Sequence, residues 1–154
     1  MIRILIVDDE EIIRKVMVKT FGKYGTCKVV SSGRDALHEF ESAFQGEEPF
    51  HLLLLDLSLD DISGLDILRA VRRMENEASV EPKNQAITIM VTGNRERAMV
   101  KDCITSGCND YILKPLKPDT VRQKLEKFGI YPLAGADLNN EGQTGHDGEE
   151  KQGE

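Results

Sequence analysis

The chain has 154 residues, of which 40% are hydrophobic and 31% are charged, and its formal net charge is −7. This size and composition predict one globular domain with its own core, and the acidic balance argues against non-specific nucleic-acid binding, which rests on lysine and arginine. The three cysteines form no CxxC pair, so we expect reduced, packed thiols rather than disulfides or a zinc site. The sequence shows no signal peptide and no run of membrane-spanning length, which predicts a cytoplasmic protein without a membrane partner.

Apolar runs alternate with helical patterns along the chain. Five runs predict β-strands, at residues 2–7, 28–30, 51–56, 86–91 and 110–113. Apolar residues at helical spacing predict five helices, over residues 12–21, 36–44, 65–74, 95–105 and 119–127,. Strands that alternate with helices are typical of an α/β fold with a doubly wound parallel sheet, in which right-handed crossovers place helices on both faces.

The third predicted strand is the most apolar part of the chain. Four leucines fill residues 52–55, and Asp56 follows them. A continuous apolar run of this kind indicates a strand that is buried on both faces, as in a parallel sheet. Asp56 then stands where the strand leaves the core, at the edge where open α/β sheets bind their ligands.

The last part of the chain differs in composition. From residue 135 onward six acids stand against one lysine, which gives this segment a charge of −5 and leaves −2 for residues 1–134. The segment is rich in glycine and has almost nothing to bury, which is typical of disordered tails. We therefore expect one folded domain at residues 1–129 and a disordered acidic tail without function at residues 130–154.

Polar residues of matching chemistry follow four of the predicted strands. They are Asp8 with Asp9, then Asp56, Thr92 and Lys114. Parallel strands end at the same edge of a sheet, so these side chains can converge. Clustered carboxylates shift their pKa or recruit a cation, and carboxylate oxygens suit Mg²⁺. With a lysine and a threonine hydroxyl beside them, they can hold a phosphoryl group on one carboxylate, because that chemistry needs mainly positioning and charge neutralisation.

This pattern resembles the receiver domain of two-component response regulators, over about residues 2–128. The matching residues are Asp8, Asp9, Asp56, Gly64, Thr92, Tyr111, Lys114 and Pro115. The resemblance implies a flavodoxin-like fold with strand order 2-1-3-4-5. It also implies a part in two-component signalling, for a protein that is not a conventional enzyme but assists its own phosphorylation and dephosphorylation.

The resemblance also implies which residues hold the phosphoryl group and the metal. Asp56 would be the phosphoacceptor, attacking phosphorus as a carboxylate nucleophile. Mg²⁺, or Mn²⁺ in its place, would be bound by Asp8, Asp9, Asp56 and the backbone carbonyl of Ser58. Ser58 and Asn94 would tune the lifetime of the acyl phosphate, neither protecting it strongly nor strongly promoting its hydrolysis.

A second group of matching residues would respond to phosphorylation. Lys114 would pair with the phosphoryl group, and its bond to Pro115 is expected to be cis, the one type of linkage where cis costs little. Thr92 would move toward a phosphoryl oxygen, and the ring of Tyr111 would then turn inward. These movements would alter the face made by the fourth helix, the fifth strand and the fifth helix.

The implied partners are proteins. A histidine kinase or a histidine phosphotransfer protein would donate the phosphoryl group, docking near the first helix, and an unknown downstream protein would bind the altered face. A phosphorylation-dependent dimer fits the same scheme, and nucleic acid does not enter it. We expect a stand-alone receiver; a receiver from a larger transcription factor or hybrid kinase is the alternative.

Some charged residues fall outside this assignment. Asp60 and Asp61 lie in the loop where many relatives carry a methionine–proline pair, and they add negative charge beside the predicted metal site. Three histidines are predicted to be structural or solvated, because none has a partner at ligand spacing: His38, His51 and His146. Three arginines form a charged face of the third predicted helix, which we expect to be solvated: Arg69, Arg72 and Arg73.

Three other classes of function are alternatives to the phosphoacceptor. A haloacid-dehalogenase phosphatase would carry a DxD motif after the first strand, whereas Asp8 and Asp9 are adjacent. A flavodoxin-like nucleotide binder would have a loop rich in serine, threonine and glycine there, whereas acids would repel a phosphate. A receiver-like interaction module that is never phosphorylated would not need the full set of side chains, so the sequence favours the phosphoacceptor.

Overall fold

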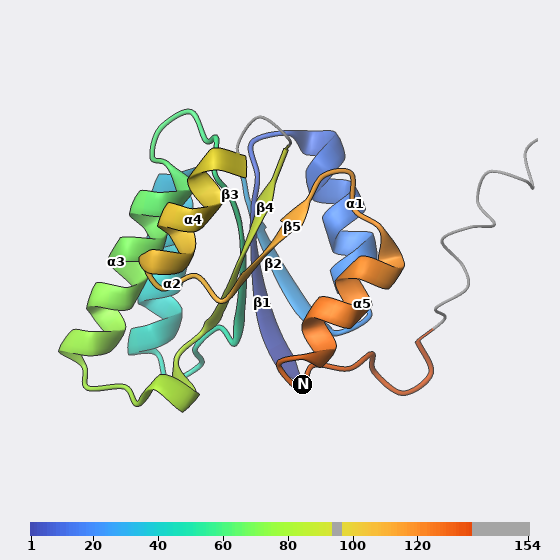
Figure 1. The fold of residues 1–154 in the computed structure, drawn as a ribbon. Coiled ribbons are helices and arrows are strands. Elements are labelled where there is room, and N and C mark those ends of the chain that lie inside the picture. Colours follow the sequence, from blue (N-terminus) through green and yellow to red (C-terminus); the bar gives the residue numbers. More distant parts are fainter. Residues whose placement is uncertain (94–96, 137–154) are drawn as a thin grey trace, which may run out of the picture.

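The five apolar runs form a single parallel sheet in the computed structural model, which describes residues 1–93 and 97–136, with Arg97 described in its backbone alone. The strand order is β2-β1-β3-β4-β5, which confirms the expected order. The strands are β1 (Ile2–Val7), β2 (Gly25–Val30), β3 (Leu52–Asp56), β4 (Ile87–Thr92) and β5 (Asp110–Leu113). Neighbouring strands are parallel throughout, so all five end at one edge (Figure 1).

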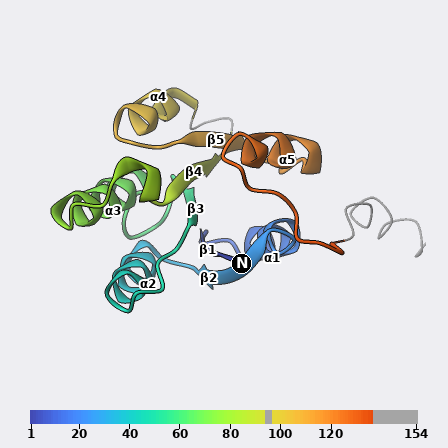
Figure 2. The same ribbon diagram turned by 90° about the horizontal axis from the view of Figure 1, so that it is seen from below.

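Within residues 1–93 and 97–136, five helices cover the two faces of the sheet. They are α1 (Glu11–Phe21), α2 (Gly33–Gln45), α3 (Gly64–Glu77), α4 (Arg97–Thr105) and α5 (Pro118–Glu126), with a short 3-10 helix at Pro82–Asn84. Helices α1 and α5 lie on one face, and α2, α3 and α4 lie on the other (Figures 1 and 2). This arrangement is the doubly wound architecture that the sequence predicts.

The leucine strand β3 divides the core into two layers. Side chains alternate along a strand, and Leu52 and Leu54 accordingly pack with Met17, Phe21 and other residues on the α1 and α5 side. Leu53 and Leu55 pack with residues of α2 and α3 on the opposite side. All four leucines are fully buried, because β3 lies in the middle of the sheet with helices over both faces.

Two elements differ from the sequence prediction. The second strand was expected at residues 28–30 but spans Gly25–Val30, because it is an edge strand whose side chains alternate between buried and exposed rather than forming an apolar run. Helix α1 begins at Glu11, one residue before the expected start, and two of the apolar residues whose spacing predicts it lie largely outside the core, because Ile12 is 76% exposed and Val16 is 43% exposed. Only the stripe that contains Met17 and Phe21 reaches the core.

The predicted tail begins with residues that contact the domain. Ile130 packs against the core layer below α1 and α5, and its backbone N–H donates to the carbonyl of Leu125 at 3.0 Å. The N–H of Leu133 donates to the carbonyl of Lys23 at 2.7 Å, at the end of α1. The tail prediction for residues 137–154 lies outside the described residues.

The three cysteines are free, with Cys103 and Cys108 buried and Cys27 half-buried, as the sequence predicts. Burial raises the pKa of Cys103 to about 11, so this thiol is not ionised at neutral pH. Within the described part of the chain, no helix combines the length and the apolar character that a membrane span requires.

Candidate phosphoryl and metal site

Strand register brings the predicted site residues to one edge of the sheet. Val7 of β1 pairs with Leu55 of β3, so Asp8 and Asp56 follow at the same level on neighbouring strands. Asp56 itself pairs with Val91 of β4, which places Thr92 one residue further along. Thr92 in turn pairs with Leu113 of β5, and Lys114 is the next residue. The convergence follows from the sheet, because every strand leaves the core in the same direction.

Three carboxylates form the centre of the site. Asp8, Asp9 and Asp56 each offer an oxygen, and these atoms all lie within 4.8 Å of one another. Asp8 is fully buried and Asp56 is 3% exposed, whereas Asp9 is half-buried. Three carboxylates at this distance repel one another in a site largely shielded from water, and a cation relieves that repulsion.

The chemistry of these groups fits a divalent cation. One oxygen of Asp8 accepts a hydrogen bond from the N–H of Glu10 at 2.9 Å. The other oxygen, Oδ2, is buried and accepts no aligned hydrogen bond among the described groups, although the Nζ atom of Lys114 lies 3.0 Å away as an ion pair. Burial and the charges of Asp60 and Asp8 raise the pKa of Asp9. An oxygen-only set with spare acceptor capacity suits Mg²⁺.

Lys114 lies between two of the carboxylates. Its Nζ atom is 3.0 Å from Asp8 and 3.6 Å from Asp56, and its side chain is 19% exposed. The backbone N–H of Lys114 donates to the carbonyl of Thr92 at 2.7 Å, which ties the end of β5 to the end of β4. The bond between Lys114 and Pro115 is cis, as the resemblance implies.

The first residues of the loop after β3 are held by a hydrogen bond to Asp56. The N–H of Ser58 donates to a carboxylate oxygen of Asp56 at 3.1 Å, so the loop turns back over the carboxylate. Gly64 comes so close to the carbonyl of Asp56 that a Cβ atom there would collide with it. This contact explains in physical terms why glycine stands eight residues after Asp56. The predicted tuning residue Asn94 lies outside the described residues.

Comparison with known proteins decides the family. The family model described as the response regulator receiver domain matches residues 4–126. The chain belongs to the response regulator receiver domain family. It is 30% identical to the chemotaxis protein CheY of Listeria monocytogenes, over 82% of this chain and 98% of that protein. This chain is therefore a receiver domain of the kind found in two-component signal transduction, which excludes the phosphatase and nucleotide-binder alternatives.

Other relatives carry the receiver inside longer proteins. The chain is 29% identical to the hybrid signal transduction histidine kinase A of Dictyostelium discoideum, where the match covers 82% of this chain and 6% of the kinase. The chain thus spans a small part of that relative. Among solved structures, the BeF3-activated DrrB receiver domain is 26% identical, with a TM-score of 0.67, and the match covers 83% of this receiver and 97% of that chain.

Tyr111 of this receiver is held on β5 by a charged neighbour. The ring is half-buried and packs against the core layer of α2 and α3. The Nζ atom of Lys124, on α5, lies 4.7 Å from the ring centroid. The same Nζ atom is 2.9 Å from a carboxylate oxygen of Asp110. One lysine therefore joins α5 to the predicted switch residue and to the start of β5.

The prediction that Arg72 is solvated is wrong. Its side chain is 12% exposed and pairs with Glu75 at 2.7 Å. It also donates to the carbonyls of Ala86 and Gly107 and to the side chain of Asn109. The sequence offers one signal for this network: Glu75 stands in line with Leu68 and Val71 on the buried stripe of α3, where an acid needs a partner.

Asp61, whose role the sequence left open, also makes specific contacts. Its carboxylate accepts hydrogen bonds from the backbone N–H groups of Gly33 and Arg34, both at 2.9 Å. These bonds lower the pKa of Asp61. His51, by contrast, is exposed and accepts a hydrogen bond from the N–H of Arg3 at 2.9 Å, which agrees with a structural role. His146 lies outside the described residues.

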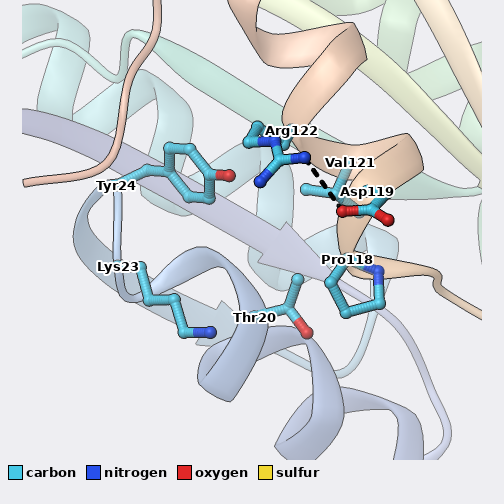
Figure 3. Close-up of a pocket in the computed structure, with 7 residues that line it drawn as sticks. All are labelled: Thr20, Lys23, Tyr24, Pro118, Asp119, Val121 and Arg122. Atoms are coloured by element: carbon cyan, nitrogen blue, oxygen red, sulfur yellow. Dashed lines mark hydrogen bonds and ion pairs between the residues drawn. The ribbon is translucent and has the colours of Figure 1, made fainter. Parts of the chain in front are cut away.

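Two hollows differ in what they can hold. The first lies between the end of α1 and the start of α5, where Thr20, Lys23 and Arg122 line it (Figure 3). Its volume is about 40 Å³, far below the several hundred Å³ of ligand pockets. The second lies beside β5, has a volume of about 420 Å³ and is lined by Tyr111, Leu113, Lys114, Pro115, Lys117, Thr120 and Lys124.

Proposed function

We propose that this receiver takes a phosphoryl group on Asp56. The observation that carries the proposal is the arrangement of three carboxylates within 4.8 Å of one another, with the Lys114 Nζ atom 3.0 Å from Asp8 and 3.6 Å from Asp56. Asp8 and Asp56 are buried, so the lysine acts where water screens its charge little. A set of this kind can hold the acceptor carboxylate and offset the charge that arrives with the phosphoryl group.

The transfer is a substitution at phosphorus. An oxygen of Asp56 attacks the phosphorus atom, the bond between phosphorus and the donor's leaving atom breaks, and the leaving group departs with that electron pair. Asp8, Asp9, Asp56 and the carbonyl of Ser58 would hold Mg²⁺, which supplies positive charge to the phosphoryl oxygens. Lys114 would supply the protein's own positive charge. The hydroxyl of Thr92 donates to the carbonyl of Gly93 at 3.1 Å in the structure and would instead donate to a phosphoryl oxygen.

The donor that we propose is a histidine kinase or a histidine phosphotransfer protein. The support is the similarity to a protein named hybrid signal transduction histidine kinase A, in which the matching segment is 6% of the whole chain. The cytoplasmic location expected from the sequence is part of this proposal, as is the self-assisted loss of the phosphoryl group.

The output that we propose is binding through the face of α4, β5 and α5. Thr92 and Tyr111 would transmit the charge change at Asp56 to that face, as a two-state switch. The hollow beside Tyr111 is lined by three lysines, so a protein target with acidic side chains would complement it.

The test is the intact mass of the protein after incubation with Mg²⁺ and a small-molecule phosphodonor. We expect the wild type to gain one phosphoryl group, and Asp56→Asn to gain none. A chelator should prevent the gain, and Asp119→Asn, which changes an exposed acid on α5, should behave as the wild type does. A folded wild type that binds Mg²⁺ but is never modified would instead support the unphosphorylated interaction module.

A further inference from the structure

The loop between β3 and α3 is fixed at its base beside the phosphoacceptor. The N–H of Ser58 donates to Asp56 at 3.1 Å, and the N–H of Gly64 donates to the carbonyl of Leu57 at 3.2 Å. The first contact lies at the start of the loop, and the second ties the end of the loop back to its start. They leave the middle, residues 59–62, to be held by other parts of the protein.

Asp61 holds the middle of this loop against a different helix. Its two carboxylate oxygens accept hydrogen bonds from the N–H groups of Gly33 and Arg34, each at 2.9 Å. These N–H groups belong to the first turn of α2, where a helix has donors without partners in its own backbone. The positive end of α2 also favours a negative charge at this point. Asp61 therefore caps α2 from a loop that lies 27 to 28 residues further along the chain.

Close packing supports the same attachment. A Cβ atom on Gly33 would lie 2.8 Å from the Cβ atom of Ile62, so the loop and the start of α2 approach each other closely at this point. Ser32 supplies the ordinary cap of α2, because its hydroxyl accepts from the N–H of Asp35 at 3.1 Å. The helix thus has a cap of its own, and the two bonds from Asp61 are additional.

Asp60, the neighbouring acid, interacts electrostatically with the predicted metal site. It is exposed, and its charge raises the pKa of Asp9 in the predicted metal site. The charge of Asp61 faces the first turn of α2 instead. Two adjacent acids of the same loop therefore serve different purposes, and only one of them attaches the loop to another element through hydrogen bonds in the described structure.

We infer that Asp61 is a positioning residue, which holds the loop carrying Ser58 in register with Asp56 by bonding to the N-terminus of α2. This inference rests on the proposed function, because Ser58 matters there through its backbone carbonyl. Outer contacts that orient a metal ligand commonly change metal affinity by about 10- to 100-fold when they are removed. Loss of the attachment should therefore weaken Mg²⁺ binding without unfolding the domain.

The experiment measures Mg²⁺ affinity by titration calorimetry in the full chain, and in parallel the Mg²⁺ concentration that gives half-maximal phosphorylation by a small-molecule donor. Asp61→Ala should raise the dissociation constant for Mg²⁺ and the half-maximal Mg²⁺ concentration, each by about tenfold. Asp61→Asn should recover part of the affinity, because its amide oxygen can accept one of the two hydrogen bonds. Asp60→Asn removes an equal charge from the same loop but keeps the hydrogen bonds of Asp61 to α2. It should therefore have a smaller effect on Mg²⁺ affinity than Asp61→Ala.

Ser32→Ala is the matched control, because it removes a cap of α2 but leaves the loop attached. Its Mg²⁺ affinity should equal that of the wild type, and urea unfolding should show that it and Asp61→Ala remain folded. Equal affinities for Asp61→Ala and Ser32→Ala would overturn the inference. If the wild type binds Mg²⁺ but accepts no phosphoryl group, the proposed function fails, while the calorimetric comparison still decides the role of Asp61.

Discussion

Asp110 and Asp119 each lie near a cation, but their surroundings differ. The carboxylate of Asp110 is 2.9 Å from Lys124 and its side chain is 14% exposed, whereas that of Asp119 is 3.0 Å from Arg122 and 81% exposed. Burial raises the pKa of Asp110, but the hydrogen bonds from Lys124 and from the backbone, together with the charge of Lys124, outweigh it and lower the pKa overall. The exposed pair is screened by water and contributes little.

This difference predicts how stability depends on pH. A carboxyl group whose pKa is lower in the folded state stabilises the protein above its unfolded pKa of about 3.9, and that contribution disappears as the pH falls through the folded value. We therefore expect Asp110→Asn to lower the free energy of unfolding by about 0.5 to 1 kcal/mol at pH 7. The difference from the wild type should shrink below about pH 4.

Urea unfolding followed by circular dichroism at pH 7 and pH 3 measures this difference. Asp119→Asn is the control, and it should change the free energy of unfolding by less than about 0.5 kcal/mol at either pH. A loss in Asp110→Asn that is the same at both pH values would show that the carboxylate does not stabilise the fold through its charge.

At the scale of elements, the pair of Arg72 and Glu75 joins three parts of the chain. Arg72 reaches from α3 to Gly107 and Asn109 before β5. Glu75 accepts from the N–H of Ala86 at 2.7 Å, just before β4. Both side chains are largely buried, so each group needs the other to compensate for its lost hydration.

Removing one member of this pair should be costly. We expect Arg72→Met to lower the free energy of unfolding by about 3 to 5 kcal/mol, because it leaves Glu75 buried without its cation. Arg69→Met removes an exposed pair with Asp66 on the same helix and should cost less than about 1 kcal/mol. Urea unfolding of both variants tests this, and equal losses would contradict the role of burial.

The elements that the sequence predicts well are those whose pattern is local. The burial of the β3 leucines and the convergence of the carboxylates at the ends of β1 and β3 could be predicted from the chain order and the geometry of parallel strands alone. The contacts of Asp61 and Arg72 were missed because each joins residues 27 to 37 positions apart. No periodicity records such a pairing, and arginine on a helix surface is usually solvated. The edge strand β2 was shortened for a related reason, since its outer side chains face water.

At the scale of the whole molecule, the chain after α5 completes the fold. Ile130 packs into the layer beneath α1 and α5, and Leu133 is bonded to the end of α1 through its N–H. A chain shortened to residues 1–129 should therefore unfold with a free energy about 1 to 3 kcal/mol lower than a chain shortened to residues 1–136. Denaturant midpoints of the two chains measure the difference, and identical midpoints would place the domain boundary at residue 129.

Because four leucines follow one another in β3, hydrophobicity alone does not fix the register of β3 against the neighbouring strands. If the register of β3 shifted by one residue, leucine would still occupy three of the four core positions, and both core layers would remain mostly apolar. Such a slip would nevertheless turn Asp56 toward the opposite face of the sheet, away from Lys114. The slip would put His51 or Asp56 in place of one buried leucine, which lowers stability, and the proposed phosphoryl transfer to Asp56 would be lost. We therefore expect an insertion or deletion within the leucines to abolish the proposed phosphoryl transfer even in a protein that still folds.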